Sequence, residues 1–169
     1  NLLWVRSFSE IYNPTLAVKI LKALQDESIG ASLCMVGPDN DGSLQKTKAC
    51  AKQLNVEVIF TGKLSKDEWI NLSKNFNIFI NTTNYDNMPV SVIEAMALGL
   101  PVISTNVGGI PFLINNEVDG VLVEPNNVEG FVEAILEMRN KPEKAINMAN
   151  LAREKAEEFN WSNVKKQWI

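Results

Sequence analysis

Residues 84–109 read NYDNMPVSVIEAMALGLPVISTNVGG, and this stretch is the strongest indication of both fold and site. An acid, Asp86, lies in a polar loop before Pro89, and an apolar helical run with a second acid, Glu94, follows. A glycine ends the helix, a short β-branched strand comes next, and a Gly-Gly pair closes the stretch. Helix starts bind phosphate through backbone N–H groups, and carboxylates accept hydrogen bonds from sugar or ribose hydroxyls. This order predicts a site for an anionic ligand rich in hydroxyl groups.

Apolar runs of four to six residues alternate with helical patterns along the chain, which is typical of a parallel sheet covered on both faces. We expect six strands, at residues 2–6, 32–36, 56–60, 77–81, 101–104 and 120–123. The pattern predicts an α/β fold: one Rossmann-like domain over residues 1–169, with about six parallel strands and helices on both faces.

The helices carry their own end signals. Asn13 and Pro14 mark the first start, the second helix is expected over 43–54, and Ser65 to Glu68 form a capping box that opens the third. The fourth helix contains Glu94. The fifth is expected to turn these residues inward: Val128, Phe131, Val132 and Ile135. The sixth, from near Pro142, is expected to do the same with Ile146, Ala149, Ala152 and Ala156.

Composition narrows the class of protein. The chain has 169 residues, 46% of them apolar, a net charge of −4 and a pI near 5.0, which indicates one globular domain with a full core. The acidic balance argues against a nucleic-acid partner, because such proteins usually carry a basic stripe. No apolar run approaches the roughly 20 residues that span a bilayer. Two scattered cysteines, Cys34 and Cys50, favour reduced thiols and a cytoplasmic protein.

The stretch at 84–109 resembles the signature of the family 4 glycosyltransferases of the GT-B fold, retaining enzymes that use nucleotide-sugar donors. That signature is an acid, seven residues, a Glu in an EAMA-like helix, then G-x-P-V-I-S/T and a Gly-Gly turn. The matching positions are Asp86, Glu94-Ala95-Met96-Ala97, Gly99, Pro101-Val102-Ile103-Ser104-Thr105 and Gly108-Gly109. A looser resemblance runs from Val5-Arg6 to Trp161. It implies the C-terminal, donor-binding half of such an enzyme, and a chain that opens at Asn1 is expected to lack the N-terminal acceptor domain.

The resemblance implies roles for three charged residues. Arg6 falls where the family has a Gly-Arg pair whose guanidinium clamps the donor diphosphate; an exposed strand-end arginine is the alternative. Asp86 replaces the family's first Glu and is expected to contact hydroxyls of the transferred sugar, although Asp also forms turns. Glu94 is expected to be a buried carboxylate that binds the ribose, with a solvated helix acid as the alternative. Arg6 and Asp86 are thus the catalytic candidates.

Further donor-binding candidates are mainly backbone groups. The helix start after Pro89 offers the N–H groups of Val90 and Ser91 to a phosphate, and the Ser91 hydroxyl adds a donor. Gly108 and Gly109 either allow close backbone approach or form a plain tight turn.

The chain departs from the family at two further positions. The family's second phosphate cation, a Lys, is replaced by Ile11 or Tyr12, so either Tyr12 or Asn13 donates a neutral hydrogen bond, or donor binding is weaker. The acid that the family places after the Gly-Gly turn is Phe112.

The resemblance also implies the ligands. The donor is a nucleotide diphospho-sugar whose base lies near Gly62 and Lys63, and the acceptor is a glycan or a lipid-linked glycan. No cofactor and no metal are expected, and peripheral association of the full-length protein with the inner face of the membrane is compatible with a lipid-linked acceptor. The base, the sugar and the linkage stay open.

Other interpretations were weighed. Asp39-Asn-Asp41 matches the D-x-D metal motif of the other large glycosyltransferase fold, but it lies in a Gly-Pro-rich loop where Asp forms turns. The chain has no histidine, which argues against a GT-B epimerase, and no marked Schiff-base Lys motif, which argues against a phosphorylase. A degenerate nucleotide-sugar-binding or partner-binding domain without turnover remains the alternative.

Overall fold

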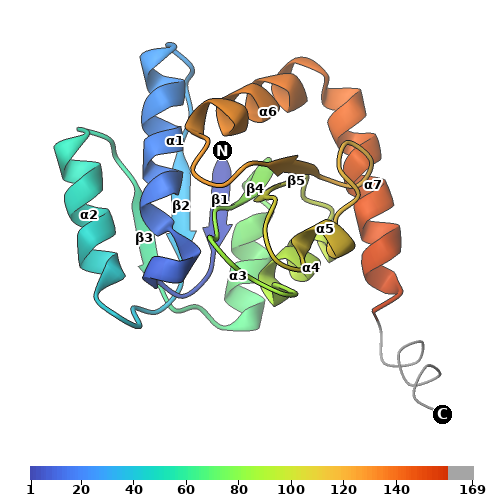
Figure 1. The fold of residues 1–169 in the computed structure, drawn as a ribbon, viewed down its shortest axis with the longest axis horizontal. Coiled ribbons are helices and arrows are strands. Elements are labelled where there is room, and N and C mark those ends of the chain that lie inside the picture. The colour runs from blue at the N-terminus through green and yellow to red at the C-terminus, as the bar shows by residue number, and fades with distance from the viewer. Residues whose placement is uncertain (160–169) are drawn as a thin grey trace.

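The structure is a computed structural model and describes residues 1–159. Its centre is a sheet of six parallel strands in the order β3-β2-β1-β4-β5-β6 (Figure 1). The strands are β1 (Leu2–Val5), β2 (Leu33–Val36), β3 (Ile59–Gly62), β4 (Ile78–Asn81), β5 (Val102–Thr105) and β6 (Val121–Val123). The prediction of a Rossmann-like sheet of six parallel strands is confirmed.

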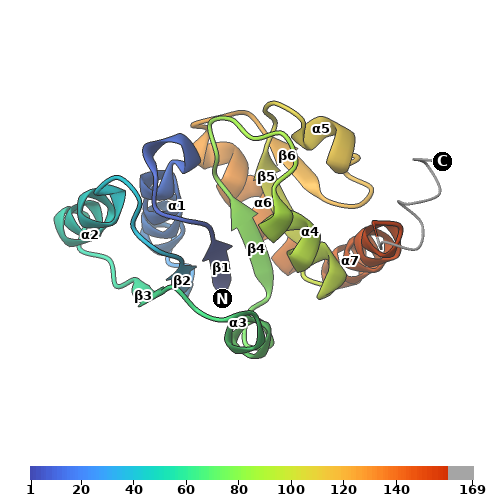
Figure 2. The same ribbon diagram turned by 90° about the horizontal axis from the view of Figure 1, so that it is seen from below.

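Helices cover both faces of the sheet. Those on one face are α1 (Pro14–Asp26), α2 (Ser43–Gln53) and α6 (Val128–Asn140). Those on the other face are α3 (Lys66–Ser73), α4 (Val90–Ala97) and α7 (Pro142–Glu157), which packs on α4. In Figure 2, α1 and α2 lie on one side of the strands and α3, α4 and α7 on the other. A short helix α5 (Ile110–Leu113) and a 3₁₀ turn η1 (Glu10–Tyr12) complete the chain.

The core follows from strands that are apolar on both faces. Along β1, Leu2 and Trp4 belong to the buried cluster under α1, whereas Leu3 belongs to the cluster under α4, because successive strand side chains alternate. Trp4 and Trp69 are buried, in agreement with a packing role; Trp161 and Trp168 lie outside the described residues. The Cys34 thiol is also buried, and burial raises its pKa to about 11, so it is an inert packing group.

The third strand begins later than predicted, at Ile59 instead of residue 56. Asn55 adopts a left-handed conformation (φ 53°), and the Val56 N–H donates to the Ala51 carbonyl, so residues 55 and 56 close the end of α2. Val56 is buried as expected, but as part of a helix end. The apolar run at residues 56–60 therefore belongs partly to the end of α2 and partly to β3. Its hydrophobic pattern does not show where one ends and the other begins.

The prediction for α7 was partly wrong. Ala149, Ala152 and Ala156 are buried as expected, but Ile146 is 60% exposed, and Ala145 takes the inward position beside it. The short helix α5 was not predicted, because four residues are too few to show a helical period.

The strand order places a topological switch point between β1 and β4. The helix after β1 covers one face and the helix after β4 covers the other, so the loops that follow these two strands diverge. In open α/β sheets the crevice outside the carboxyl ends of the strands at such a point is where ligands bind.

Candidate functional site

The two catalytic candidates meet at this switch point. Arg6 directly follows β1 and Asp86 lies in the loop after β4, and an Arg6 Nη donates to a carboxylate oxygen of Asp86. The side chains are 20% and 11% exposed, so the ion pair is largely shielded from water. The attraction between two shielded charges is stronger than between exposed ones. Removal of either partner would leave a poorly hydrated, unpaired charge, which destabilises the fold.

Tyr12 packs against the same guanidinium. The Arg6 Cζ lies 4.2 Å from the centre of the Tyr12 ring, within the range of a cation–π contact. At the position where the family has a second phosphate-binding cation, this chain therefore has the Tyr12 ring, which packs against Arg6. Within residues 1–159 the Tyr12 hydroxyl makes no side-chain hydrogen bond, and the Asn13 amide donates to Asn84 and Asn126.

A threonine pair at the end of β4 holds the two loops together. The Thr82 hydroxyl accepts from Trp4 Nε1 at 3.0 Å and donates toward the carbonyls of Tyr12 and Asn13, each at 3.0 Å. Thr83 Oγ1 lies 3.2 Å from the Ile11 carbonyl oxygen, which also accepts the Asn84 N–H at 2.7 Å. The loop that carries Arg6 is thereby fixed to the strand that leads to Asp86. The sequence indicates Thr82 and Thr83 as a strand end at the ligand-binding edge, but it does not show which loop their hydroxyl groups bind.

Two buried polar atoms in this region have no partner within the described residues: Arg6 Nε and Ser91 Oγ. Buried donors without a partner are rare in folded proteins and call for an explanation. Both atoms belong to residues that the sequence predicts to bind the donor diphosphate.

The start of α4 is uncapped. Pro89 at the N-cap cannot offer a side-chain acceptor, and within residues 1–159 no group accepts from the N–H groups of Val90 and Ser91. These two donors and the Ser91 hydroxyl lie in the first turn of one helix, where the helix dipole favours negative charge. The predicted phosphate-binding groups are thus free in the structure.

The glycine pair packs against the loop of Asp86. The Gly109 N–H donates to the Asp86 carbonyl at 2.9 Å. A Cβ would lie 2.1 Å from the Asp86 carbonyl oxygen at Gly108, and 2.0 Å from the Asn87 carbonyl oxygen at Gly109. Close approach is therefore required at both positions, and the partner that approaches is the Asp86 loop.

Glu94 differs from the expectation of a buried carboxylate. Its side chain is 28% exposed, and its Oε1 lies 3.2 Å from Nζ of Lys66, the first residue of α3. The apolar residues on either side of Glu94 favoured a buried carboxylate. An eight-residue helix that packs on a sheet still keeps one face partly exposed, and Glu94 lies on that face. Lys66 was not predicted as a site residue; nothing in its local sequence marks it.

Gly62 and Lys63 lie at the end of β3, two strands away from β1. Gly62 adopts a left-handed conformation (φ 73°), and its carbonyl accepts the Gly37 N–H at 2.9 Å. Lys63 is exposed. Phe112, at the position of the family's further acid, is 88% exposed and offers no polar group.

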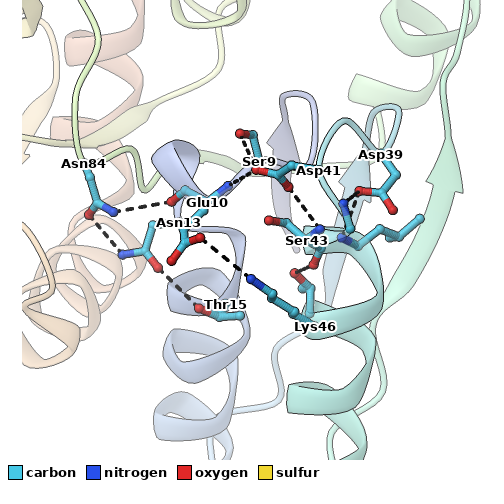
Figure 3. A network of polar contacts seen from close by, with 12 residues as sticks. Ser9, Glu10, Asn13, Thr15, Asp39, Asp41, Ser43, Lys46 and Asn84 are labelled. Carbon is cyan, nitrogen blue, oxygen red and sulfur yellow. Dashed lines mark hydrogen bonds and ion pairs between the residues drawn. The ribbon is translucent and has the colours of Figure 1, made fainter.

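The Asp39-Asn-Asp41 segment is a turn, as interpreted from the sequence (Figure 3). Asp41 accepts from the Ser9 hydroxyl at 2.8 Å and the Glu10 N–H at 2.9 Å. Hydrogen bonds from Ser43, then from Glu10 and Ser9, lower the pKa of the Asp41 carboxyl. Asp39 accepts from the backbone of the α2 start. Asp39 is thus engaged by its own loop, and Asp41 by Ser43 and by the loop after β1.

A cavity of about 610 Å³ lies at the opposite edge of the sheet, near the starts of β1, β4 and β5. Its lining is mostly apolar, with Arg139 as its charged residue. The Arg6–Asp86 pair lies instead at the carboxyl edge of the sheet, where the sequence predicts the donor site. Within residues 1–159, no three Asp, Glu or Cys side chains gather as a metal site, and no helix has the length and apolarity to cross a membrane.

Comparison with known proteins identifies the chain's relatives. The family model described as "Glycosyl transferases group 1" matches residues 2–155. A galactosyltransferase of Escherichia coli, named for the acceptor alpha-D-GlcNAc-diphosphoundecaprenol and the donor UDP-Gal, is 32% identical over 46% of this chain and 20% of its own. The sulfoquinovosyl transferase SQD2 of Arabidopsis thaliana is 27% identical over 86% of this chain and 28% of its own.

The solved structures agree on the fold. HepE of Anabaena, crystallised with UDP and glucose, superimposes on 99% of this chain and 46% of its own with a TM-score of 0.88 and 19% identity. The chain thus spans less than half the length of each of these proteins.

Proposed function

The chain belongs to the group 1 glycosyl transferases, and from this premise we propose that it is the donor-binding domain of a glycosyltransferase that uses a nucleotide diphospho-sugar. The observation that carries the proposal is the pair of unpartnered buried donors, Arg6 Nε and Ser91 Oγ, beside the switch point of the sheet. Both atoms are buried, so the two side chains must turn before a diphosphate can supply acceptors for them. UDP is the first nucleotide to test, because HepE was crystallised with it.

The diphosphate is assigned to Arg6 and the start of α4. Arg6 is permanently charged, and its side chain is 20% exposed beside Asp86, which engages one of its Nη groups. The N–H groups of Val90 and Ser91 and the Ser91 hydroxyl add neutral donors under the helix dipole. When the bond to the sugar breaks, negative charge grows on the leaving diphosphate, and donors already in place stabilise it without reorganisation.

The hydroxyl groups of the donor are assigned to the two acids. Asp86 lies beside Arg6 and would accept from hydroxyls of the transferred sugar; its second carboxylate oxygen is available for this. Glu94 lies farther along α4 and would accept from the ribose. Gly62 and Lys63, at the end of β3, would lie toward the base, in keeping with the family resemblance.

Transfer with retention and without a metal is part of the proposal. The family resemblance supports both, and the carboxylates of Asp39 and Asp41 accept hydrogen bonds that fix the loops around them, which favours a structural role for the D-x-D segment. Calorimetry with UDP in the presence of Mg²⁺ or of EDTA tests the second point: equal affinity is expected, and binding that requires Mg²⁺ would contradict it. The anomeric configuration of the product, read by NMR, tests the first.

The acceptor is proposed to be a glycan or a lipid-linked glycan bound mainly by an N-terminal domain. The E. coli relative, whose named acceptor carries diphosphoundecaprenol, supports the lipid-linked form. Such an acceptor would bring the full-length, cytoplasmic protein to the inner face of the membrane. Residues 1–169 alone are expected to fold and to bind donor but to transfer no sugar. Transfer by this chain alone would contradict the two-domain proposal.

A degenerate donor-binding domain is the second candidate. It is favoured by Tyr12 in place of a second cation and by the exposed Phe112 in place of an acid. Calorimetry with UDP, GDP, ADP and uridine tests the shared element, which is binding of a nucleoside diphosphate. Turnover by the full-length protein then separates the two: donor binding with no transfer to any acceptor supports the degenerate domain.

A further inference from the structure

Glu94 has a partner on the neighbouring helix: Lys66 Nζ lies 3.2 Å from its Oε1. The two residues belong to different helices, α3 and α4, on the same face of the sheet. The Lys66 side chain is 70% exposed, so the ion pair with Glu94 is open to water. The carboxylate assigned to the ribose is therefore held by one cation at one of its two oxygens.

The backbone beneath Lys66 is fixed. Lys66 is the first residue of α3, and the capping box before it is complete: the Ser65 N–H donates to Glu68 Oε2 at 2.7 Å, and the Glu68 N–H donates to Ser65 Oγ at 3.4 Å. The helix start cannot shift without breaking these bonds. Lys66 thus reaches Glu94 from a rigid anchor, although its own stem is flexible.

We propose that Lys66 is a positioning residue for Glu94. It holds Oε1 and directs the carboxylate so that Oε2 remains free to accept from the ribose hydroxyls. A Glu side chain has three rotatable bonds, so an unheld carboxylate must lose that freedom when the ribose binds, whereas a held one has already lost part of it. The inference deepens the proposed function and rests on it, since it assumes that Glu94 binds the ribose.

The proposal makes the effect of Lys66 depend on two partners. Loss of the Lys66 ammonium should weaken binding only while Glu94 is charged and the ligand carries ribose hydroxyls. An exposed ion pair contributes modestly, so the expected loss for Lys66→Met is about two- to fivefold in the affinity for UDP. Lys66→Arg keeps the charge and should restore most of the affinity.

The test is a double-mutant cycle by titration calorimetry on residues 1–169, with UDP and 2′,3′-dideoxy-UDP as ligands. The variants are Lys66→Met, Lys66→Arg, Glu94→Gln and the double variant Lys66→Met with Glu94→Gln. Lys74→Met serves as the control, because this substitution changes the net charge by the same amount. Lys74 lies at the other end of α3, where it donates to Asn71. Circular dichroism on each variant verifies that the fold is kept.

The expected result is a loss with Lys66→Met for UDP that is absent for the dideoxy ligand, absent in the Glu94→Gln background and absent in Lys74→Met. Unchanged or tighter UDP binding by Lys66→Met overturns the role of Lys66, as does an equal loss for both ligands. If the wild-type chain binds no nucleoside diphosphate, the proposed function itself fails and the inference fails with it. Binding by the wild type without coupling to Glu94 overturns the inference alone.

Discussion

Arg6 and Asp86 form an ion pair across the crevice between β1 and β4, although 80 residues separate them in the sequence. The group proposed to stabilise the leaving diphosphate and the acid proposed to bind the sugar are thus partners in the ligand-free chain. A diphosphate that binds here would meet an arginine with one Nη already engaged by Asp86 and with Nε buried, without a partner among residues 1–159. The pair sets the orientation of both side chains before any donor arrives.

Arg6→Ala should remove most of the preference for nucleoside diphosphate over nucleoside. A hydrogen bond to a charged group contributes about 1.5–3 kcal/mol, so UDP affinity should fall by roughly ten- to a hundredfold while uridine affinity changes little. Added salt should weaken UDP binding to the wild type. Calorimetry with the two ligands measures this. Equal losses for UDP and uridine would show that Arg6 acts through packing, and no loss would leave the start of α4 as the phosphate site.

Glu94→Gln should weaken UDP binding and spare the fold. The amide keeps the size of the side chain but replaces a charged acceptor by a neutral one, at a cost on the order of 1–2 kcal/mol in UDP binding. Since Glu94 is part-exposed, the melting temperature should hardly change. Unchanged affinity in calorimetry would remove Glu94 from the site, and an unfolded variant would indicate a structural role.

Tyr12→Leu should weaken UDP binding, and Tyr12→Phe should not. The Tyr12 ring stacks on the Arg6 guanidinium, and a cation–π contact contributes about 0.5–2 kcal/mol, depending on how far it is desolvated. Phe keeps the ring and loses only the hydroxyl, so it separates the stack from a hydrogen bond to the ligand. A loss of affinity with Tyr12→Phe as large as with Tyr12→Leu would assign the effect to the hydroxyl.

Gly109→Ala should destabilise the chain and disturb the Asp86 loop. The new methyl group would lie 2.0 Å from the Asn87 carbonyl oxygen, so backbone must move, at a cost of roughly 1–3 kcal/mol. Gly30→Ala is the matched control, because nothing lies within 4 Å of a Cβ there. Thermal melts and UDP titrations of both variants measure the effect. Equal stability of the two would mean that the loop gives way freely.

Ser65→Ala should destabilise α3 by about 1 kcal/mol at neutral pH, as loss of an N-cap does. The Ser65 side chain, and then its N–H, lower the pKa of Glu68 below its ordinary 4.5 by hydrogen bonding. A depressed carboxyl pKa stabilises the fold above the unfolded value, and this contribution is lost as the pH falls through the folded value. The difference between wild type and Ser65→Ala should therefore shrink in urea titrations below about pH 4. A difference that is constant with pH would contradict the coupling.

Helix ends that depend on neighbouring residues were predicted correctly from the sequence at α3 and α4. The capping box at Ser65 forms as expected, because it depends on residues three apart. The start of α4 after Pro89 and its end near Gly99 also follow from neighbouring residues. The site's position follows from the fold class, since parallel strands bring their carboxyl ends to one edge.

By itself, then, the sequence determined the class of sheet, its six strands and the two covered faces, because each depends on residues near one another in the chain. The edge that carries the site stays a prediction. Only the tertiary structure decided which side chains meet at that edge. Arg6 with Asp86, and Glu94 with Lys66, are pairs whose members follow different strands or belong to different helices. Whether they meet depends on the strand order and on the contacts that fix each loop. Thr82, for example, fixes the loop of Arg6 through the carbonyls of Tyr12 and Asn13. Coulomb attraction acts over a few ångströms in space, and separation along the chain carries no information about it.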